Sequence, residues 1–75
     1  MPKLSLVSYK LLVHVFELEG FRCVREEGDH LVYSKAGISR PIVIPKYRAV
    51  PVFVIKNNLR SAGISRERYF ELLQI

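Results

Sequence analysis

The sequence predicts a small α+β domain in the order helix, strand, strand, strand, helix, with a short helical segment at the end. Apolar residues recur at helical spacing in two separate stretches, and three short strand-forming runs divided by turn signals lie between them. The short connections favour a three-stranded antiparallel meander with the helices on one face. The 75 residues are expected to form one domain, because so short a chain cannot build two independent cores.

The first helix is predicted over Tyr9–Glu19. Ser8 precedes it as an N-cap candidate, and Gly20 follows it at the position where helices commonly end. The apolar stripe within it consists of Leu11, Leu12, Val15, Phe16 and Leu18. The residues before it are expected to form an extended lead-in that packs on the body, through Leu4, Leu6 and Val7.

Three strands are predicted next. The first covers Phe21 to Glu26, with Phe21, Cys23 and Arg25 on one side, so that Cys23 is expected to be a small core residue. Gly28-Asp29 is a turn signal, and Leu31–Ser34 reads as the second strand. The third strand, Pro41–Pro45, is expected to end at its last residue, because proline cannot donate to a strand ladder.

The second helix is predicted to begin with Pro51 in its first turn and to end at Gly63. Its apolar stripe consists of Val52, Ile55, Leu59 and Ala62. Ser65 is then expected to cap a short helix over Arg66–Gln74. Four side chains of that segment need burial: Tyr69, Phe70, Leu72 and Leu73.

Composition limits the possible functions. Twelve Lys and Arg against seven Asp and Glu give a net charge of +5, which favours a polyanionic partner such as RNA. No apolar run approaches the ~20 residues of a membrane span, and Met1-Pro2-Lys3-Leu4 lacks a signal-peptide layout. A single cysteine favours a reducing compartment, so we expect a cytoplasmic protein.

No metal or other cofactor is expected. The cysteine and the two histidines, Cys23, His14 and His30, show no ligand-pair spacing of the kind that structural zinc sites use. His14 lies at the margin of the first helical stripe and is expected to be a surface or boundary residue.

His30 is the candidate catalytic residue. It follows Glu27-Gly28-Asp29 at the predicted hairpin turn, and histidine can take or give a proton near neutral pH. On a basic scaffold it could act as general acid–base on an RNA phosphodiester. The alternative is that the side chain simply caps the hairpin.

Candidate RNA contacts lie around the second helix. Lys56 and Arg60 are four residues apart and project from one helix face, whereas Lys46 and Arg48 precede the helix. These charges could instead form an ordinary solvated surface. Tyr47 could stack on a base or be a half-buried loop residue. Phe53 is expected either to be exposed for a protein partner or to be buried under the Lys46–Val50 loop.

The chain resembles the HicA family of small RNA-cleaving toxins from toxin–antitoxin systems. The resemblance covers nearly the whole chain and rests on the order of several short motifs: Val7-Ser8, Glu19-Gly20-Phe21, Val24-Arg25-Glu26-Glu27-Gly28-Asp29-His30, Val43-Ile44-Pro45, Leu59-Arg60-Ser61-Ala62-Gly63-Ile64-Ser65 and Phe70-Glu71-Leu72-Leu73. It implies an α-β-β-β-α sandwich like that of double-stranded-RNA-binding domains. It also implies that His30 is the catalytic histidine and that an antitoxin of the HicB type covers the active face.

Three positions depart from the family pattern. Asp29 stands where the family usually has serine, Tyr47 where many members have histidine, and Phe53-Val54 where Gly-Thr often opens the second helix.

The resemblance and the position of His30 together predict a metal-independent endoribonuclease that cleaves mRNA through His30. The alternative is a non-catalytic module of the same fold that binds RNA or protein. A DNA-binding domain is a weaker third possibility, because no helix-turn-helix pair or zinc pattern is present.

Overall fold

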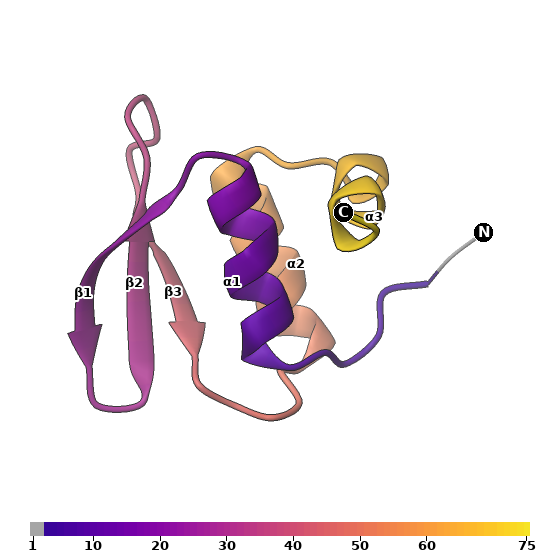
Figure 1. The fold of residues 1–75 in the computed structure, drawn as a ribbon, viewed down its shortest axis with the longest axis horizontal. Coiled ribbons are helices and arrows are strands. Elements are labelled where there is room, and N and C mark those ends of the chain that lie inside the picture. The colour runs from indigo at the N-terminus through magenta and orange to yellow at the C-terminus, as the bar shows by residue number, and fades with distance from the viewer. Residues whose placement is uncertain (1–2) are drawn as a thin grey trace.

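The computed structural model of the chain describes residues 3–75 and confirms the α+β fold class (Figure 1). The first two residues, which belong to the start judged to lack a signal-peptide layout, lie outside this range. The elements follow in the order α1 Tyr9–Leu18, β1 Arg22–Glu27, β2 His30–Ser34, β3 Ile42–Pro45, α2 Val52–Ala62 and α3 Arg66–Leu73.

The ends of α1 are set by the residues that the sequence indicated. The Ser8 hydroxyl accepts the Lys10 backbone N–H at 3.2 Å, and Gly20 turns the chain with a φ of +92°. Glu19 is the C-cap, so the helix ends one residue earlier than predicted. Of the predicted stripe, Leu12, Val15 and Phe16 are fully buried, whereas its flanking members Leu11 and Leu18 remain exposed.

The sheet is antiparallel in the order β1-β2-β3, as predicted. The first strand begins and ends one residue later than expected, and it does not alternate regularly. Its register shifts between Cys23 and Arg25, where Val24 forms a bulge, so that Arg25 lies opposite Val32. The prediction that Cys23 and Arg25 share one side with Phe21 is therefore wrong at Arg25.

The prediction that Cys23 is a core residue is also wrong. Every residue of β1 is exposed, including Cys23, because α1 and α2 pack against β3 and leave β1 at the outer edge of the sheet (Figure 1). The inner face of the sheet nevertheless carries apolar side chains of β2 and β3. They join the helices in one core through Leu31, Tyr33, Ile42 and Ile44.

The second half of the chain confirms Gly63 and Ser65 as helix ends and corrects the place of Pro51. Pro51 is the N-cap of α2 rather than a residue of its first turn, and Gly63 ends the helix with a φ of +71°. Ser65 caps α3 by accepting the Arg68 backbone N–H at 3.0 Å. The Arg68 guanidinium then donates to Glu19 at the end of α1, with an Nη2–Oε1 distance of 2.8 Å, which ties α3 to the body.

The burial expected for α3 and the lead-in is confirmed in most positions. Tyr69 and Leu72 are fully buried, and Phe70 and Leu73 pack against the core from partly buried positions. Val7 of the lead-in forms a β-bridge with Val50, and Leu4 also packs on the core, whereas Leu6 stays exposed.

Tyr33 links the sheet to α1. Its hydroxyl donates to Glu17 Oε2 at 3.0 Å, and burial together with this hydrogen bond raises the pKa of Tyr33 to about 12. The folded state therefore keeps a proton that the unfolded chain loses near pH 10. The contribution of Tyr33 to stability is complete below pH 10 and is lost as the pH rises toward 12.

Because the pKa of Tyr33 is raised, we expect the free energy of unfolding to fall by roughly 2 kcal/mol between about pH 10 and pH 12. Urea unfolding at pH 9 and pH 11.5 measures this fall, and Tyr33→Phe, which removes the titrating group, should reduce it. An equal fall in both proteins would show that Tyr33 is not its source.

Candidate functional site

His30 lies at one end of the hairpin formed by β1 and β2. Gly28 has a φ of +56° and begins the two-residue turn, a position where a positive φ favours glycine. His30 is the first residue of β2 rather than part of the turn, and it pairs with Glu27 of β1 and Pro45 of β3. The imidazole is therefore carried by a central strand with a neighbour on each side.

The His30 side chain faces away from the helices. Side chains alternate along a strand, and the next residue, Leu31, belongs to the core. His30 consequently shares the outer face of the sheet with Val32, and the His30 side chain is exposed. The ring has no protein hydrogen-bond partner within residues 3–75, so it is available to a molecule approaching this face.

Two of the cationic side chains at this end of the sheet form ion pairs with carboxylates. Lys46 pairs with Glu26, and Arg25 pairs with Glu27. The hydrogen bond to Glu26 raises the pKa of Lys46. Glu26 lies opposite Leu31 on the inner face, so the Lys46 ammonium is drawn to the side of the sheet away from the His30 ring. Sequence reasoning could not detect this pairing, because the partners are 20 residues apart.

Tyr47 and Arg48 lie in the loop between β3 and α2, at the same end of the molecule as the His30 turn (Figure 1). Backbone hydrogen bonds hold this loop: Lys46 N–H donates to the Asp29 carbonyl at 2.7 Å, and Tyr9 N–H to the Tyr47 carbonyl at 3.0 Å. Both side chains are exposed, Tyr47 by 47%. The loop therefore presents an aromatic ring and a cation from a fixed backbone.

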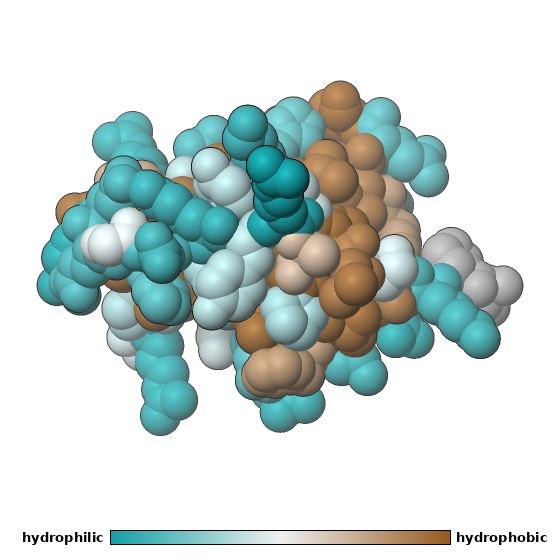
Figure 2. All heavy atoms as spheres, turned by 90° about the horizontal axis from the view of Figure 1, so that it is seen from below, coloured by the Kyte–Doolittle hydropathy of each residue, from teal (hydrophilic) through white to brown (hydrophobic). Residues whose placement is uncertain are grey.

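Phe53 is 67% exposed, which decides between the two alternatives for this residue in favour of exposure. Viewed from below, the end of the molecule that carries the His30 turn shows hydrophilic side chains over the strands and a hydrophobic area beside them over the helices (Figure 2). Exposed aromatic and aliphatic side chains in the lead-in, the loop and the start of α2 include Leu6, Tyr47 and Phe53.

Lys56 and Arg60 are exposed on α2, as predicted, but they are gathered with a third cation that sequence reasoning missed. They line a hollow of about 250 Å³ together with Arg66, and neither His30 nor Lys46 is among the lining residues. The sequence pattern identified Arg66 only as the first residue of the last helix and not as a candidate for binding. Its place directly after the Ser65 cap, close in sequence to the end of α2, was the signal that could have identified it.

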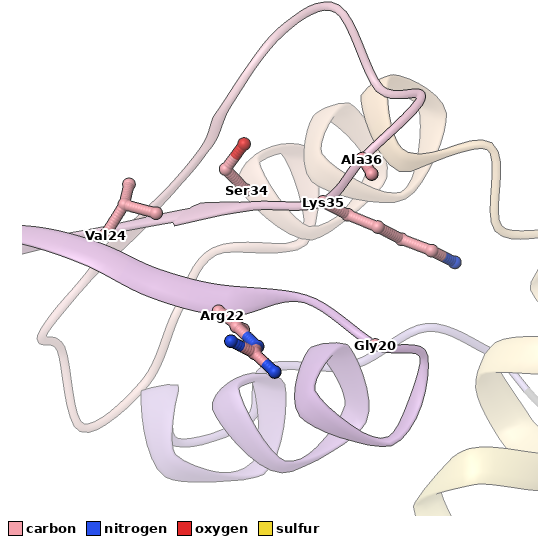
Figure 3. A pocket seen from close by; sticks show the side chains of 6 residues that line it. All are labelled: Gly20, Arg22, Val24, Ser34, Lys35 and Ala36. Carbon is pink, nitrogen blue, oxygen red and sulfur yellow. The ribbon is translucent and has the colours of Figure 1, made fainter.

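A second, larger hollow of about 580 Å³ lies at the opposite end of the hairpin from His30. Figure 3 shows its lining side chains, with Arg22 and Val24 on β1 and Ser34 to Ala36 at the end of β2. The Lys35 ammonium lies 5.6 Å from the centre of the Phe21 ring, a distance at which a cation and an aromatic face attract. This hollow is open and is built around the edge of the sheet.

His14 lies exposed on α1, as predicted. Within residues 3–75 there is no group of three or more His, Cys, Asp and Glu side chains that could hold a metal ion. The helices of that same part of the chain include none long and apolar enough to cross a membrane. Comparisons with models of protein families, with curated proteins and with solved structures found no match.

Proposed function

We propose that this protein is a metal-independent endoribonuclease of the HicA toxin type, with a fold like that of double-stranded-RNA-binding domains and a place in the cytoplasm. The observation that carries the proposal is the position of His30. Its backbone is held between two strands, while its ring is exposed on the outer face and has no protein partner within residues 3–75. The net charge of +5 supports a polyanionic substrate.

The reaction would use the ribose itself as the nucleophile. His30 takes the proton of the 2′-hydroxyl, and the 2′-oxygen forms a bond to the adjacent phosphorus. The bond from phosphorus to the 5′-oxygen breaks, and a proton from imidazolium or water goes to that leaving oxygen. The products are a 2′,3′-cyclic phosphate and a free 5′-hydroxyl, so RNA is cut and DNA, which lacks the 2′-hydroxyl, is spared.

Tyr47 and Arg48 are placed to bind substrate rather than to transfer the first proton. An exposed tyrosine ring can stack on an unpaired base, and an exposed guanidinium can bind a phosphate. Lys46 contributes less than the sequence indicated, because its ammonium pairs with Glu26. RNA could recruit it only by competing with this carboxylate.

An antitoxin of the HicB type is the protein partner in this proposal. A contact over Phe53, Tyr47 and the neighbouring basic residues would bury an exposed hydrophobic area, and such areas commonly mark protein interfaces. Acidic residues on the partner would complement the net charge. A partner that also covered His30 would silence the enzyme and shield the imidazole from chemical modification, whereas unchanged His30 reactivity in a verified complex would contradict this arrangement.

The second candidate is a binding module of the same fold without catalysis, acting on RNA or on a protein. The specific observation in its favour is the acidic surroundings of His30. Asp29 precedes it, Glu27 pairs with it across the hairpin, and two nearby cations are already held by carboxylates. Such surroundings oppose the approach of a phosphate.

Cleavage of a labelled RNA in the presence of EDTA separates the two candidates. We expect the purified protein to cut this RNA, to leave cyclic-phosphate ends and to spare DNA of the same sequence. Retention of RNA binding without cleavage, in a folded protein free of inhibitor, would replace the enzyme by the binding module. Cleavage that EDTA abolishes would contradict the metal-independent mechanism.

A further inference from the structure

The hollow beside α2 and α3 combines three positive side chains with a hydrophobic floor. Lys56, Arg60 and Arg66 surround it, and the floor is made by Leu4, Leu59 and Ile64. Leu59 and Ile64 are only 5% and 8% exposed, so the floor is part of the packed body. Its lining residues come from the lead-in, α2, the turn after α2 and the start of α3, and they include neither His30 nor any strand residue. Figure 1 shows α3 on the side of α1 and α2 away from the sheet.

The chain brings these three cations together by a fixed turn. Lys56 and Arg60 lie one helical turn apart on α2. Gly63 then reverses the chain, with Gly63 N–H donating to the Arg60 carbonyl at 3.2 Å and Ile64 N–H to the Leu59 carbonyl at 3.0 Å. This closure packs Ile64 onto the core and sets Arg66, the first residue of α3, beside the end of α2.

Within the part of the chain that the structure describes, no carboxylate forms an ion pair with the cations of this cluster. Among residues 3–75, ion pairs join Arg25, Lys46 and Arg68 to glutamates, but none involves the three cations of the hollow. No carboxylate is among the lining residues. Like charges held close together repel, so an anion bound between them would relieve that repulsion.

We propose that this hollow is a second RNA subsite, which binds one phosphate and its ribose several nucleotides away from the bond that His30 cuts. The proposal rests on the function proposed above for its polyanionic ligand. Three cations suit a phosphate, and the apolar floor suits the carbon face of the attached sugar or base. At about 250 Å³ the hollow is smaller than the ~300–1,000 Å³ of typical small-molecule pockets, so it fits a unit of a longer chain.

A distal subsite makes catalysis depend on RNA length. A long RNA can occupy both the His30 end and the hollow, whereas a dinucleotide reaches only the first. Removing the cations of the hollow should therefore raise KM for long RNA and leave kcat and KM for a dinucleotide unchanged. A purely structural role for these residues would affect both substrates alike.

The decisive test compares two triple variants of equal charge. One carries Lys56→Gln, Arg60→Gln and Arg66→Gln; the control carries Lys10→Gln, Arg22→Gln and Arg40→Gln, which also lowers the net charge by three. Fluorescence anisotropy with a 2′-O-methyl RNA, which cannot be cut, gives the Kd across a range of KCl concentrations. Circular dichroism checks that both variants fold.

We expect the hollow variant to bind at least about tenfold more weakly and the salt slope of its log Kd to fall by about 0.7, since the hollow binds one phosphate and each lost single-strand phosphate contact removes ~0.7. The control should change much less. Equal losses in the two variants would overturn the subsite and indicate general charge attraction. Unchanged RNA binding with loss of an acidic protein partner would make the hollow a protein contact and would also overturn it.

The same measurements distinguish a failure of the subsite from a failure of the proposed function. If the wild-type protein binds RNA through the hollow but cuts none, the subsite stands and the enzyme is wrong. If the wild-type protein cuts RNA but the hollow variant matches the control for both long RNA and dinucleotide, the enzyme stands and the subsite is wrong.

Discussion

His30→Ala is expected to lower the rate of RNA cleavage by about 10²–10⁴-fold, the usual effect of losing a general acid–base group. The fold should remain, because the His30 side chain is exposed and has no protein hydrogen-bond partner within residues 3–75. RNA affinity should change little, since the proposed function assigns the phosphate contacts to other residues. Single-turnover cleavage of a labelled RNA, with anisotropy for binding, measures the two effects separately.

His14→Ala is the matched control for this prediction. His14 is also exposed, but it lies on α1 rather than at the end of the hairpin. The His14 variant should cut RNA at the wild-type rate. The assignment of His30 would be wrong if its alanine variant cut as fast as the wild-type protein, or if both histidine variants lost activity equally.

Phe16→Ala is expected to remove most of the stability of the domain. Phe16 is fully buried, and its ring meets the Phe21 ring edge-on with 5.4 Å between centroids. Replacing a buried phenylalanine by alanine costs about 3–5 kcal/mol, because it removes apolar contacts and leaves a cavity. A domain of this size rarely has more than about 3–5 kcal/mol to lose. Urea unfolding followed by circular dichroism should show little or no cooperative transition at 25 °C.

Phe53→Ala makes the same chemical change at a position that is 67% exposed. Its free energy of unfolding should stay within about 0.5 kcal/mol of the wild-type value, as for most surface substitutions. A loss at Phe53 as large as that at Phe16 would mean that the two side chains are buried alike, contrary to the structure.

The sequence predicted the helices well because their ends are determined locally. Ser8 and Ser65 cap helices through their own hydroxyl groups, and Gly20 and Gly63 adopt the positive φ values that end them. The environment of the first strand could not be predicted in this way. Whether Cys23 is buried depends on how far the helices extend across the sheet, and strand alternation alone does not contain that information.

The candidate site was predicted in part. His30 was placed at the hairpin correctly, although it begins β2 instead of lying in the turn. The pairing of Lys46 with Glu26 joins β1 to the residue that follows β3, so it follows from the register and not from local sequence. The clustering of Arg66 with Lys56 and Arg60 depends on the turn between α2 and α3, which sequence spacing alone does not orient.

The position of β1 has a consequence for motion near His30. This strand is held to the body by the β2 ladder and by the Lys46–Glu26 ion pair, while its side chains remain in water. Elements with few buried contacts open locally at a lower free-energy cost than global unfolding. On the other side, His30 lies opposite Pro45, the last residue of β3. When β1 peels away, His30 therefore loses one of its two strand neighbours, and the imidazole gains freedom to move.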